Sequence, residues 1–260
     1  MKNGAHRSIG SEIPKNKTYL KPGLGLLLFG LIWAWNSSSL AGIITIETQT
    51  SVSVHANKID VKVTAKNNGI ESAFGIQAQL TLFDETLLSR VQSRIEPETS
   101  QTFTFEKPRP DLTKGRYPLT IRVVFHDANQ YPFSAVSGLT FPMGEDTISD
   151  LQVQSEDITL DRKRDLAIGL KNLGSDSKMV RARLFLPREL IADKPEAHFR
   201  LNGQSAKKIR WVLRNFSALN GAVYPVAGYF EYDSNGKHYT SMARLLIRIV
   251  QKENFFSPPP

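Results

Sequence analysis

The residues best suited to chemistry are histidines and carboxylates, and their spacing matches no common reactive site. The chain of 260 residues has no cysteine, which excludes thiol nucleophiles, zinc ribbons and iron–sulfur ligation. Four histidines follow the first forty residues: His55, His126, His198 and His238. None lies two or four residues from another, the spacing that places two ligands on one side of a strand or helix. We therefore expect no metal site, and we expect His126 and His238, which flank predicted turns, to be exposed.

Closely spaced polar pairs all fall in predicted turns: Asp84/Glu85, Glu96/Glu98, Asp127/Asn129 and Asp233/Asn235. Each of the last two pairs offers two oxygen ligands, whereas calcium takes six to eight. Their place in a turn explains these pairs more simply. No G-x-S-x-G elbow and no glycine-rich phosphate loop occurs. We predict no catalytic residue, no bound metal and no cofactor, so the protein is expected not to be an enzyme.

Basic residues form the one candidate contact surface: Arg181, Arg183, Lys208 and Arg210. Arg181 and Arg183 alternate with apolar neighbours, so they are predicted to point outward from a strand. Lys208 and Arg210 align, at an offset of 106 residues, with two threonines on the outer face of an earlier predicted strand, so they are predicted to point outward as well. Trp211 is predicted to lie in the core. Residues 42–145 hold 10 bases and 11 acids, a net charge of −1, and residues 146–260 hold 18 and 13, a net charge of +5. This candidate basic contact face either meets an anionic partner or is merely a solvated sheet face.

The first 41 residues have the layout of a secretory signal peptide. They carry five basic residues and one acid, an uncharged apolar run at 24–35, and small residues before a cleavage site after Ala41. A run of twelve residues is about 18 Å long as a helix, short of the roughly 30 Å of a bilayer core. An uncleaved N-terminal anchor is the alternative. Removing this segment reduces the net charge from +8 to 28 − 24 = +4.

Export without cysteine indicates a bacterial protein of the periplasm or the cell surface. Small exported eukaryotic domains usually carry disulfides. A partner would be an envelope protein or an anionic glycan or lipid surface, with membrane contact only through an uncleaved N-terminal segment. Nucleic acid is not expected, because an exported protein has little access to it.

Period-two alternation of apolar residues dominates the chain beyond residue 42. The clearest segments are residues 59–65, 76–83, 102–105 and 119–125. Many short alternating segments separated by turn residues predict antiparallel β-sandwiches.

An internal repeat divides this region into two modules. Three signals return in order, about 106 residues later: Asp60–Ser72 as Asp165–Ser177, Gly115–Leu119 as Ala222–Val226, and His126–Gln130 as Tyr232–Gly236. The predicted domains are residues 42–145 and 146–252, followed by a tail at 253–260. Within the first repeated signal, Gly69 and Gly174 lie where a predicted strand ends. They are expected to supply the positive φ of a tight turn.

The repeated segments resemble the bacterial cell-adhesion-related (CARDB-like) immunoglobulin-like modules. The resemblance rests on Val63–Gly69, Glu96–Ser100 and Lys114–Tyr117 in the first copy and on Leu170–Gly174 and Tyr224–Val226 in the second. In the second copy Leu201–Ser205 replaces the proline-containing turn. The resemblance implies an all-β fold of two tandem immunoglobulin-like sandwiches used for surface display, adhesion or assembly. It supplies no catalytic residue.

The expected function is that of an exported, non-catalytic binding or structural protein of the bacterial envelope. Its contacts would use sandwich faces, strand edges and loops. One alternative is a periplasmic assembly chaperone that donates a strand edge to its client. Another is an accessory component, or an unrecognised hydrolase, of polysaccharide processing. Phe255 and Phe256 in the tail are expected to pack on their own domain.

Overall fold

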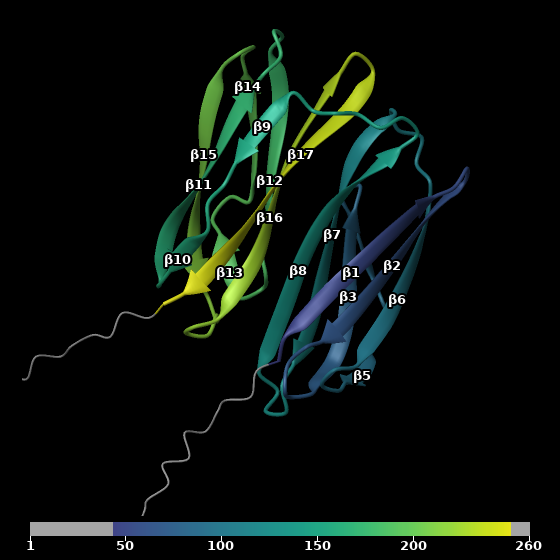
Figure 1. Cartoon of the computed structure of the whole chain (residues 1–260), viewed down its shortest axis with the longest axis vertical. Helices are drawn as coiled ribbons and strands as arrows, with labels where there is room; N and C mark the ends of the chain where they lie inside the picture. Colours follow the sequence, from purple (N-terminus) through teal and green to yellow (C-terminus); the bar gives the residue numbers. More distant parts are fainter. Residues whose placement is uncertain (1–43, 251–260) are drawn as a thin grey trace, which may run out of the picture. The chain divides into compact units, whose positions relative to one another are not determined.

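The computed structural model describes residues 44–250, which belong to one compact unit. The predicted signal peptide and the tail with Phe255 and Phe256 lie outside the described residues. Within them the chain is all-β and contains no helix (Figure 1). Its strands are β1 (Ile46–Val54), β2 (Lys58–Asn67), β3 (Ala73–Leu82), β4 (Glu85–Leu88), β5 (Gln92–Ile95), β6 (Ser100–Pro108), β7 (Gly115–His126), β8 (Pro132–Met143), β9 (Leu151–Gln154), β10 (Ile158–Leu160), β11 (Lys163–Asn172), β12 (Lys178–Phe185), β13 (Leu190–Ala192), β14 (Glu196–Leu201), β15 (Ala206–Asn215), β16 (Val223–Ser234) and β17 (Lys237–Ile249).

These strands form three hydrogen-bonded sheets. One has three strands in the order β1-β2-β6, and another has four in the order β13-β15-β11-β9. The third has ten strands and follows the order β14-β12-β16-β17-β7-β3-β4, with β5, β8 and β10 paired beside this path. It passes from a first group of strands, β1–β8, to a second group, β9–β17, through a single parallel residue pair, Gly115 with His238.

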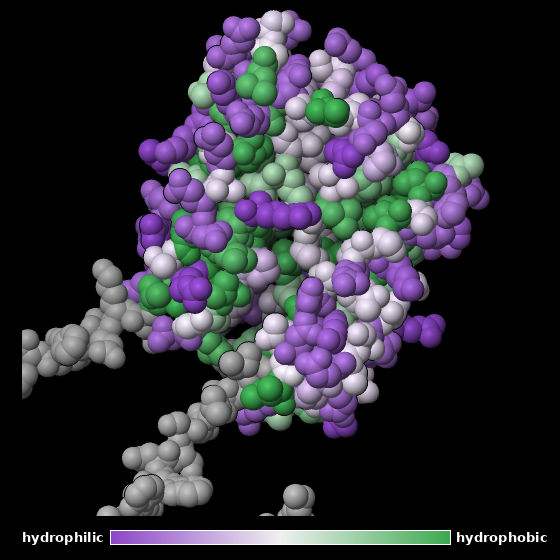
Figure 2. Space-filling view, in the orientation of Figure 1, coloured by the Kyte–Doolittle hydropathy of each residue, from purple (hydrophilic) through white to green (hydrophobic). Residues whose placement is uncertain are grey.

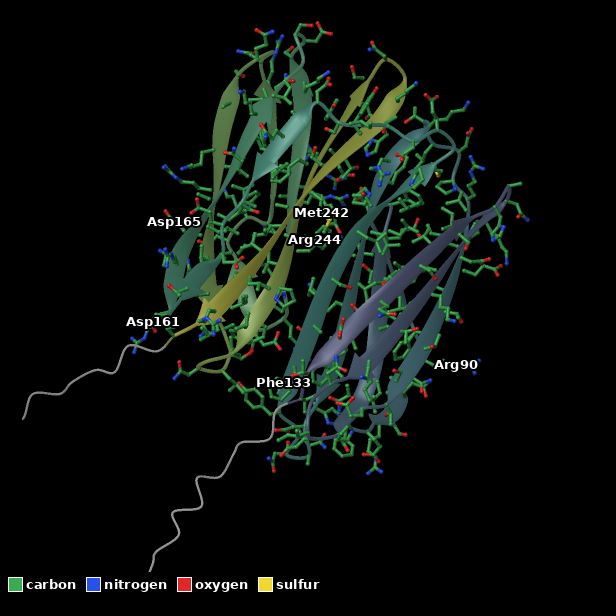
Figure 3. The ribbon with its side chains drawn as sticks, viewed as in Figure 1. Arg90, Phe133, Asp161, Asp165, Met242 and Arg244 are labelled. Atoms are coloured by element: carbon green, nitrogen blue, oxygen red, sulfur yellow. The ribbon has the colours of Figure 1, made fainter. Side chains whose placement is uncertain are left out.

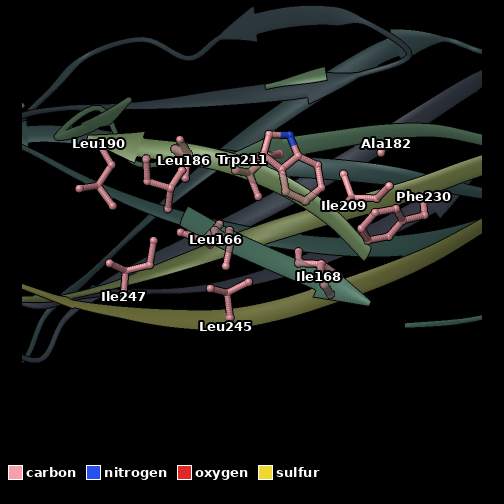
Figure 4. Close-up of a cluster of buried hydrophobic side chains, with 14 of the residues drawn as sticks. Leu166, Ile168, Ala182, Leu186, Leu190, Ile209, Trp211, Phe230, Leu245 and Ile247 are labelled. Carbon is pink, nitrogen blue, oxygen red and sulfur yellow. The ribbon is translucent and has the colours of Figure 1, made fainter. Parts of the chain in front are cut away.

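Two separate hydrophobic cores lie between these sheets. The first joins the three-stranded sheet to β3, β7 and β8, and the second joins the four-stranded sheet to β12, β16 and β17. Alternation in the sequence produces both: in β2, for example, Ile59, Val61 and Val63 are buried while their neighbours are not. Figure 4 shows the second core, where Trp211 packs near Phe230. The prediction that Trp211 belongs to the core is confirmed, since its exposure is 3%.

The repeated asparagines have the same structural role in both cores. Asn67 and Asn172 end β2 and β11, and both are completely buried. The side-chain amide of Asn67 donates to the carbonyl of Glu71 at 2.7 Å, and that of Asn172 donates to the carbonyl of Asp176 at 2.8 Å. A buried amide that satisfies backbone groups in this way closes the loop after each strand.

The prediction for the glycines that follow was wrong, because neither Gly69 nor Gly174 has a positive φ. Each instead donates its N–H to the side-chain oxygen of the preceding buried asparagine, at 3.0 and 3.1 Å. At Gly174 a larger residue would also lack space, because a Cβ atom there would lie 2.8 Å from a carboxylate oxygen of Asp150. The turn is therefore formed by the asparagine side chain.

The two predicted hairpin turns are confirmed between β7 and β8 and between β16 and β17. In the first, one carboxylate oxygen of Asp127 accepts the N–H groups of Asn129 and Tyr131, both at 2.8 Å. In the second, Asn235 and Gly236 have φ values of 51° and 68°, as a two-residue hairpin loop requires. These local roles account for the polar residues at both turns.

Candidate functional site

The structure does not bring the four predicted basic residues together on one face. Arg181 and Arg183 lie on β12 in the ten-stranded sheet, whereas Lys208 and Arg210 lie on β15 in the four-stranded sheet. Alternation correctly placed all four side chains outside the second core. It carried no information about which sheet each strand joins, so the single face predicted from sequence is corrected to two separate pairs.

The β12 pair is neutralised by acids, one of which comes from the first group of strands. Asp84, in the turn between β3 and β4, contacts the guanidinium of Arg181 at 2.7 Å and also that of Arg183. Arg183 pairs in addition with the buried Glu231 at 2.6 Å, and Arg181 pairs with Glu196 at 2.9 Å. Through their ion pairs with Asp84, these arginines therefore link the two groups of strands.

These contacts extend into a run of alternating charges, which we call the charge chain. In order of contact its members are His238, Glu231, Arg183, Asp84, Arg181, Glu196 and His198. Burial raises the pKa of Asp84, but the two arginines outweigh this effect and leave that pKa below its ordinary value. The hydrogen bond from Arg181, with a smaller contribution from His198, lowers the pKa of Glu196 to about 2.

His238 is not the exposed turn residue that the sequence predicted. Its side chain is only 13% exposed and stacks on the ring of Tyr117, with ring centroids 4.2 Å apart. Its Nδ1 lies 2.8 Å from a carboxylate oxygen of Asp233, and its Nε2 lies 3.4 Å from Glu231. Burial lowers the pKa of His238, but the two carboxylates outweigh burial and raise it above the ordinary value.

A second set of contacts between the two groups of strands is buried and polar. The hydroxyl of Tyr229, a fully buried residue, donates to the carbonyl of Leu119 at 2.7 Å. Burial raises the pKa of Tyr229 to about 12. Gly138 permits this approach, because a Cβ atom there would lie 2.2 Å from the Tyr229 oxygen.

Glu189 provides a similar contact at the edge of β8. Its carboxylate is fully buried and accepts the backbone N–H of Ser134 at 2.5 Å and the hydroxyl of Ser134 at 2.7 Å. Burial raises the pKa of Glu189. An unpaired buried polar group is costly, so contacts of this kind hold the two groups of strands in one arrangement.

Lys208 and Arg210, by contrast, have no acidic partner within the described residues. In the pairing of β15 with β11, Lys208 lies opposite Gly169 and Arg210 lies opposite Ala167, so small residues adjoin both cations. Lys163 and Lys171, on the same side of β11, also form no ion pair in this part of the chain. We call the four cations without an acidic partner among the described residues on the outward side of β15 and β11, namely Lys163, Lys171, Lys208 and Arg210, the cationic face. Arg214 lies on the same side of β15, opposite Lys163, but pairs with Asp193 at 3.1 Å. The cationic face also carries one acid, Asp165.

A cleft lies between the two groups of strands, on the side where β1 and β8 meet β16 and β17. Its volume is about 630 Å³, and its lining residues are Thr48, Thr50, Val136, Ser137, Gly138, Leu139, Asp157, Pro225, Val226, Ala227, Met242, Arg244, Leu245 and Leu246. Figure 2 shows a hollow with hydrophobic residues on both sides. Figure 3 shows Met242 and Arg244 between β17 and β8. No sequence pattern points to this cleft, since its residues come from five distant segments.

The described part of the chain contains no group of three or more histidines and acids able to hold a metal ion. Among residues 44–250 there is also no helix long and apolar enough to cross a membrane.

Comparison with known proteins gives a likeness of fold only. No family model matches the chain, and no curated protein matches it. Among solved structures, the Escherichia coli chaperone DraB matches with 12% identity and a TM-score of 0.29, over 38% of this chain and 54% of the chaperone. The native conformation of Escherichia coli alpha-2-macroglobulin matches with 8% identity and a TM-score of 0.32, over 79% of this chain and 17% of that protein.

Red sea bream transglutaminase matches with 11% identity and a TM-score of 0.26, over 80% of this chain and 31% of the enzyme. The chain thus spans about half of the chaperone and less than a third of the other two. At these TM-scores we draw no functional argument from the likenesses.

Proposed function

We propose that the protein is an exported, non-catalytic binding protein of the bacterial envelope that contacts an acidic polysaccharide through its cationic face. The observation that carries this proposal is the contrast in pairing: Arg181 and Arg183 are held by acids, whereas Lys208 and Arg210 have none within the described residues. Cations without internal partners are available to an external anion.

The cationic face fits a charged polymer better than a lipid surface. Between its cations lie Ala167, Gly169 and Val212, whereas proteins that bind membrane surfaces add large apolar side chains to their basic residues. Lys208 and Arg210 are two residues apart on one strand, so their Cα atoms are about 7 Å apart. A polymer with regularly spaced carboxylates is able to contact both.

The architecture belongs to the same proposal. We infer that the two cores correspond to two tandem immunoglobulin-like modules, at residues 42–145 and 146–252, related to CARDB-like modules. The two separate cores and the matching roles of Asn67 and Asn172 support this inference.

Binding to a polyuronate, with neutral dextran as the comparison, tests the proposed function. The double variant Lys208→Glu with Arg210→Glu is expected to bind polyuronate at least about tenfold more weakly at low salt, and raising the salt should weaken wild-type binding. The matched control is Lys62→Glu with Arg90→Glu. It changes the net charge by the same amount, at two exposed residues of the first group of strands. Equal loss in both variants, or preference for anionic vesicles over polyuronate, would contradict the proposal.

Export needs a separate measurement. We expect the protein in the periplasmic or surface fraction of a bacterium that expresses the full chain, with a mature N-terminus at Gly42. A cytoplasmic protein that retains residues 1–41 would contradict this part of the proposal. A chain that is exported but uncleaved would indicate the N-terminal anchor instead.

A further inference from the structure

The first strand of the three-stranded sheet has an open hydrogen-bonding edge. Within residues 44–250, β1 pairs with β2 and with no strand on its other side. At the two ends of this ladder, the carbonyl of Thr45 accepts from the N–H of Asn68, and the N–H of His55 donates to the carbonyl of Lys58. Odd-numbered residues of β1 therefore bond to β2. Because the pattern alternates, the even-numbered residues from Ile46 to Val54 direct their N–H and C=O groups away from it.

This edge lacks most of the features that usually prevent strand addition, and its one charged residue, Glu47, is hydrogen-bonded by the side chain of Asn68 at 2.7 Å. β1 has nine residues in unbroken register with β2, and its sequence contains no proline, lysine or arginine. The neighbouring edge of β8 is blocked by side chains: the N–H of Ser134 donates to Glu189, and the carbonyl of Gly138 accepts from Arg244 at 3.0 Å. The two strand edges that border this cleft therefore differ. Side chains occupy backbone groups at the edge of β8, whereas among residues 44–250 no strand pairs with the outer edge of β1.

The cleft supplies the other walls of a site for an extended chain. Thr48 and Thr50 bring the open edge into it, and the hydroxyl of Thr50 is buried without a hydrogen-bond partner. The opposite wall is apolar, because Pro225 and Leu246 form a cross-strand pair and Leu246 is 44% exposed.

Arg244 adds a charge to this site. Its guanidinium donates to the carbonyl of Gly138, and no carboxylate of the described residues forms an ion pair with it. The other charged lining residue, Asp157, is accounted for differently, because its carboxylate accepts the N–H of Leu246 at 2.8 Å. The cleft thus leaves a cation free to meet an acidic group.

We propose that this cleft binds an extended segment of another protein, which adds to the three-stranded sheet as a neighbour of β1. Backbone groups of the segment would pair with the even-numbered residues of β1, alternate apolar side chains would rest on Pro225 and Leu246, and an acidic side chain would meet Arg244. This site uses no residue of the cationic face, so it stands or fails independently of the proposed function.

A synthetic peptide tests the site directly. The probe is Thr-Val-Thr-Glu-Thr-Val-Thr, whose valines and glutamate share one face as Leu246 and Arg244 do, and its control is the same peptide with alternate amides N-methylated, which removes backbone donors from one edge. Hydrogen exchange followed by NMR is expected to slow at least about tenfold at the amides of Thr48, Thr50 and Val52 when the unmodified peptide binds. The N-methylated peptide should give no such protection.

Two variants make the test independent of any one substitution. Thr50→Pro removes an outward-facing N–H, which an edge strand tolerates, and Leu246→Asp places a charge in the apolar wall. Each is expected to weaken peptide binding at least about tenfold. Ile191→Asp is the matched control: Ile191 is 43% exposed, lies on β13 outside the cleft, and should leave binding within about twofold. Thermal unfolding of each variant verifies that it is folded.

Three results would overturn the proposal. The first is equal binding of the two peptides, or protection at residues other than those of β1. The second is protection of the β1 amides before any peptide is added, which would assign the edge to another segment of this chain. The third is protection that rises with protein concentration and disappears in Thr50→Pro, which would assign the edge to a second copy. Peptide binding that persists in the double variant of Lys208 and Arg210 would separate this site from the cationic face.

Discussion

Arg183 and Arg210 have the same residue type and both point outward from a strand beside the second core, yet their surroundings differ. Arg183 is 12% exposed and contacts Asp84 and Glu231. Arg210 is exposed, with Ala167 opposite it and no acid within ion-pair distance in the described residues. An outward-pointing cation therefore has two different environments in this molecule. One is structural, because the other group of strands covers it with an acid, and one is available to a partner.

The largest difference between these two arginines is expected in the stability of variants that lack one or the other. Arg183→Ala leaves the buried Glu231 with His238, 3.4 Å away, in place of the closer arginine, so we expect a loss of about 3 kcal/mol in the free energy of unfolding. Arg210→Ala should stay within about 0.5 kcal/mol of wild type. Urea unfolding of both variants measures the difference. Similar losses in the two would show that the pairing of Arg183 adds no stability.

A smaller effect is expected at the shared acid. Asp84→Asn keeps a residue that tolerates the observed φ of 65° but removes the charge that serves two arginines. Because the Asp84 side chain is 53% exposed, we expect a loss of about 1–2 kcal/mol. Glu106→Gln is the control, since Glu106 is 66% exposed and, among residues 44–250, pairs only with Lys58. A change at Asp84 no larger than at Glu106 would argue against a linking role.

The stability that His238 contributes is expected to depend on pH. The folded-state pKa of His238 is raised above its ordinary value of 6.5. Its contribution is therefore fully present below pH 6.5 and is lost as the pH rises through the folded-state pKa. The difference in unfolding free energy between wild type and His238→Gln should shrink across this range. A difference that is constant with pH would mean that His238 does not ionise in the folded protein.

The carboxylate at the other end of the charge chain has the opposite dependence. The pKa of Glu196 is lowered to about 2 from an ordinary value of 4.5. Its contribution is present above pH 4.5 and is lost as the pH falls toward 2. Comparison of Glu196→Gln with wild type by urea unfolding at pH 6, 4 and 3 should show a stability difference that becomes steadily smaller as the pH falls. The effect is expected to be small, because the pair is partly exposed.

The smallest effect is expected at the cationic face. Lys208→Glu with Arg210→Glu should change the unfolding free energy by no more than about 0.5 kcal/mol, because neither residue has an internal partner among those described. Measured beside the polyuronate binding described above, this result would separate a binding role from a structural one. A marked loss of stability would show instead that these cations help to hold the four-stranded sheet.

Sequence patterns predicted what depends on neighbours along the chain. Alternation gave the buried positions of β2 and of β15, including Trp211, and turn residues gave both hairpins. The acid at Asp84 lies 99 residues from Arg183, and no local pattern links them. His238 was misjudged for the same reason. The residue beside a turn is usually exposed, but here Tyr117 of the other group of strands covers it.

The single residue pair that joins the two halves of the ten-stranded sheet also limits how such modules can be strung together. Gly115 permits the joint, because a Cβ atom there would lie 2.1 Å from the carbonyl oxygen of His238. The equivalent position of the second copy is Ala222, which has a Cβ atom. At this joint the two groups of strands are not interchangeable, because the first has the glycine that the close approach requires and the aligned position in the second is an alanine. An array extended from this protein would need a new kind of joint, or a mutation of Ala222 to glycine, before a further copy could dock in the same way.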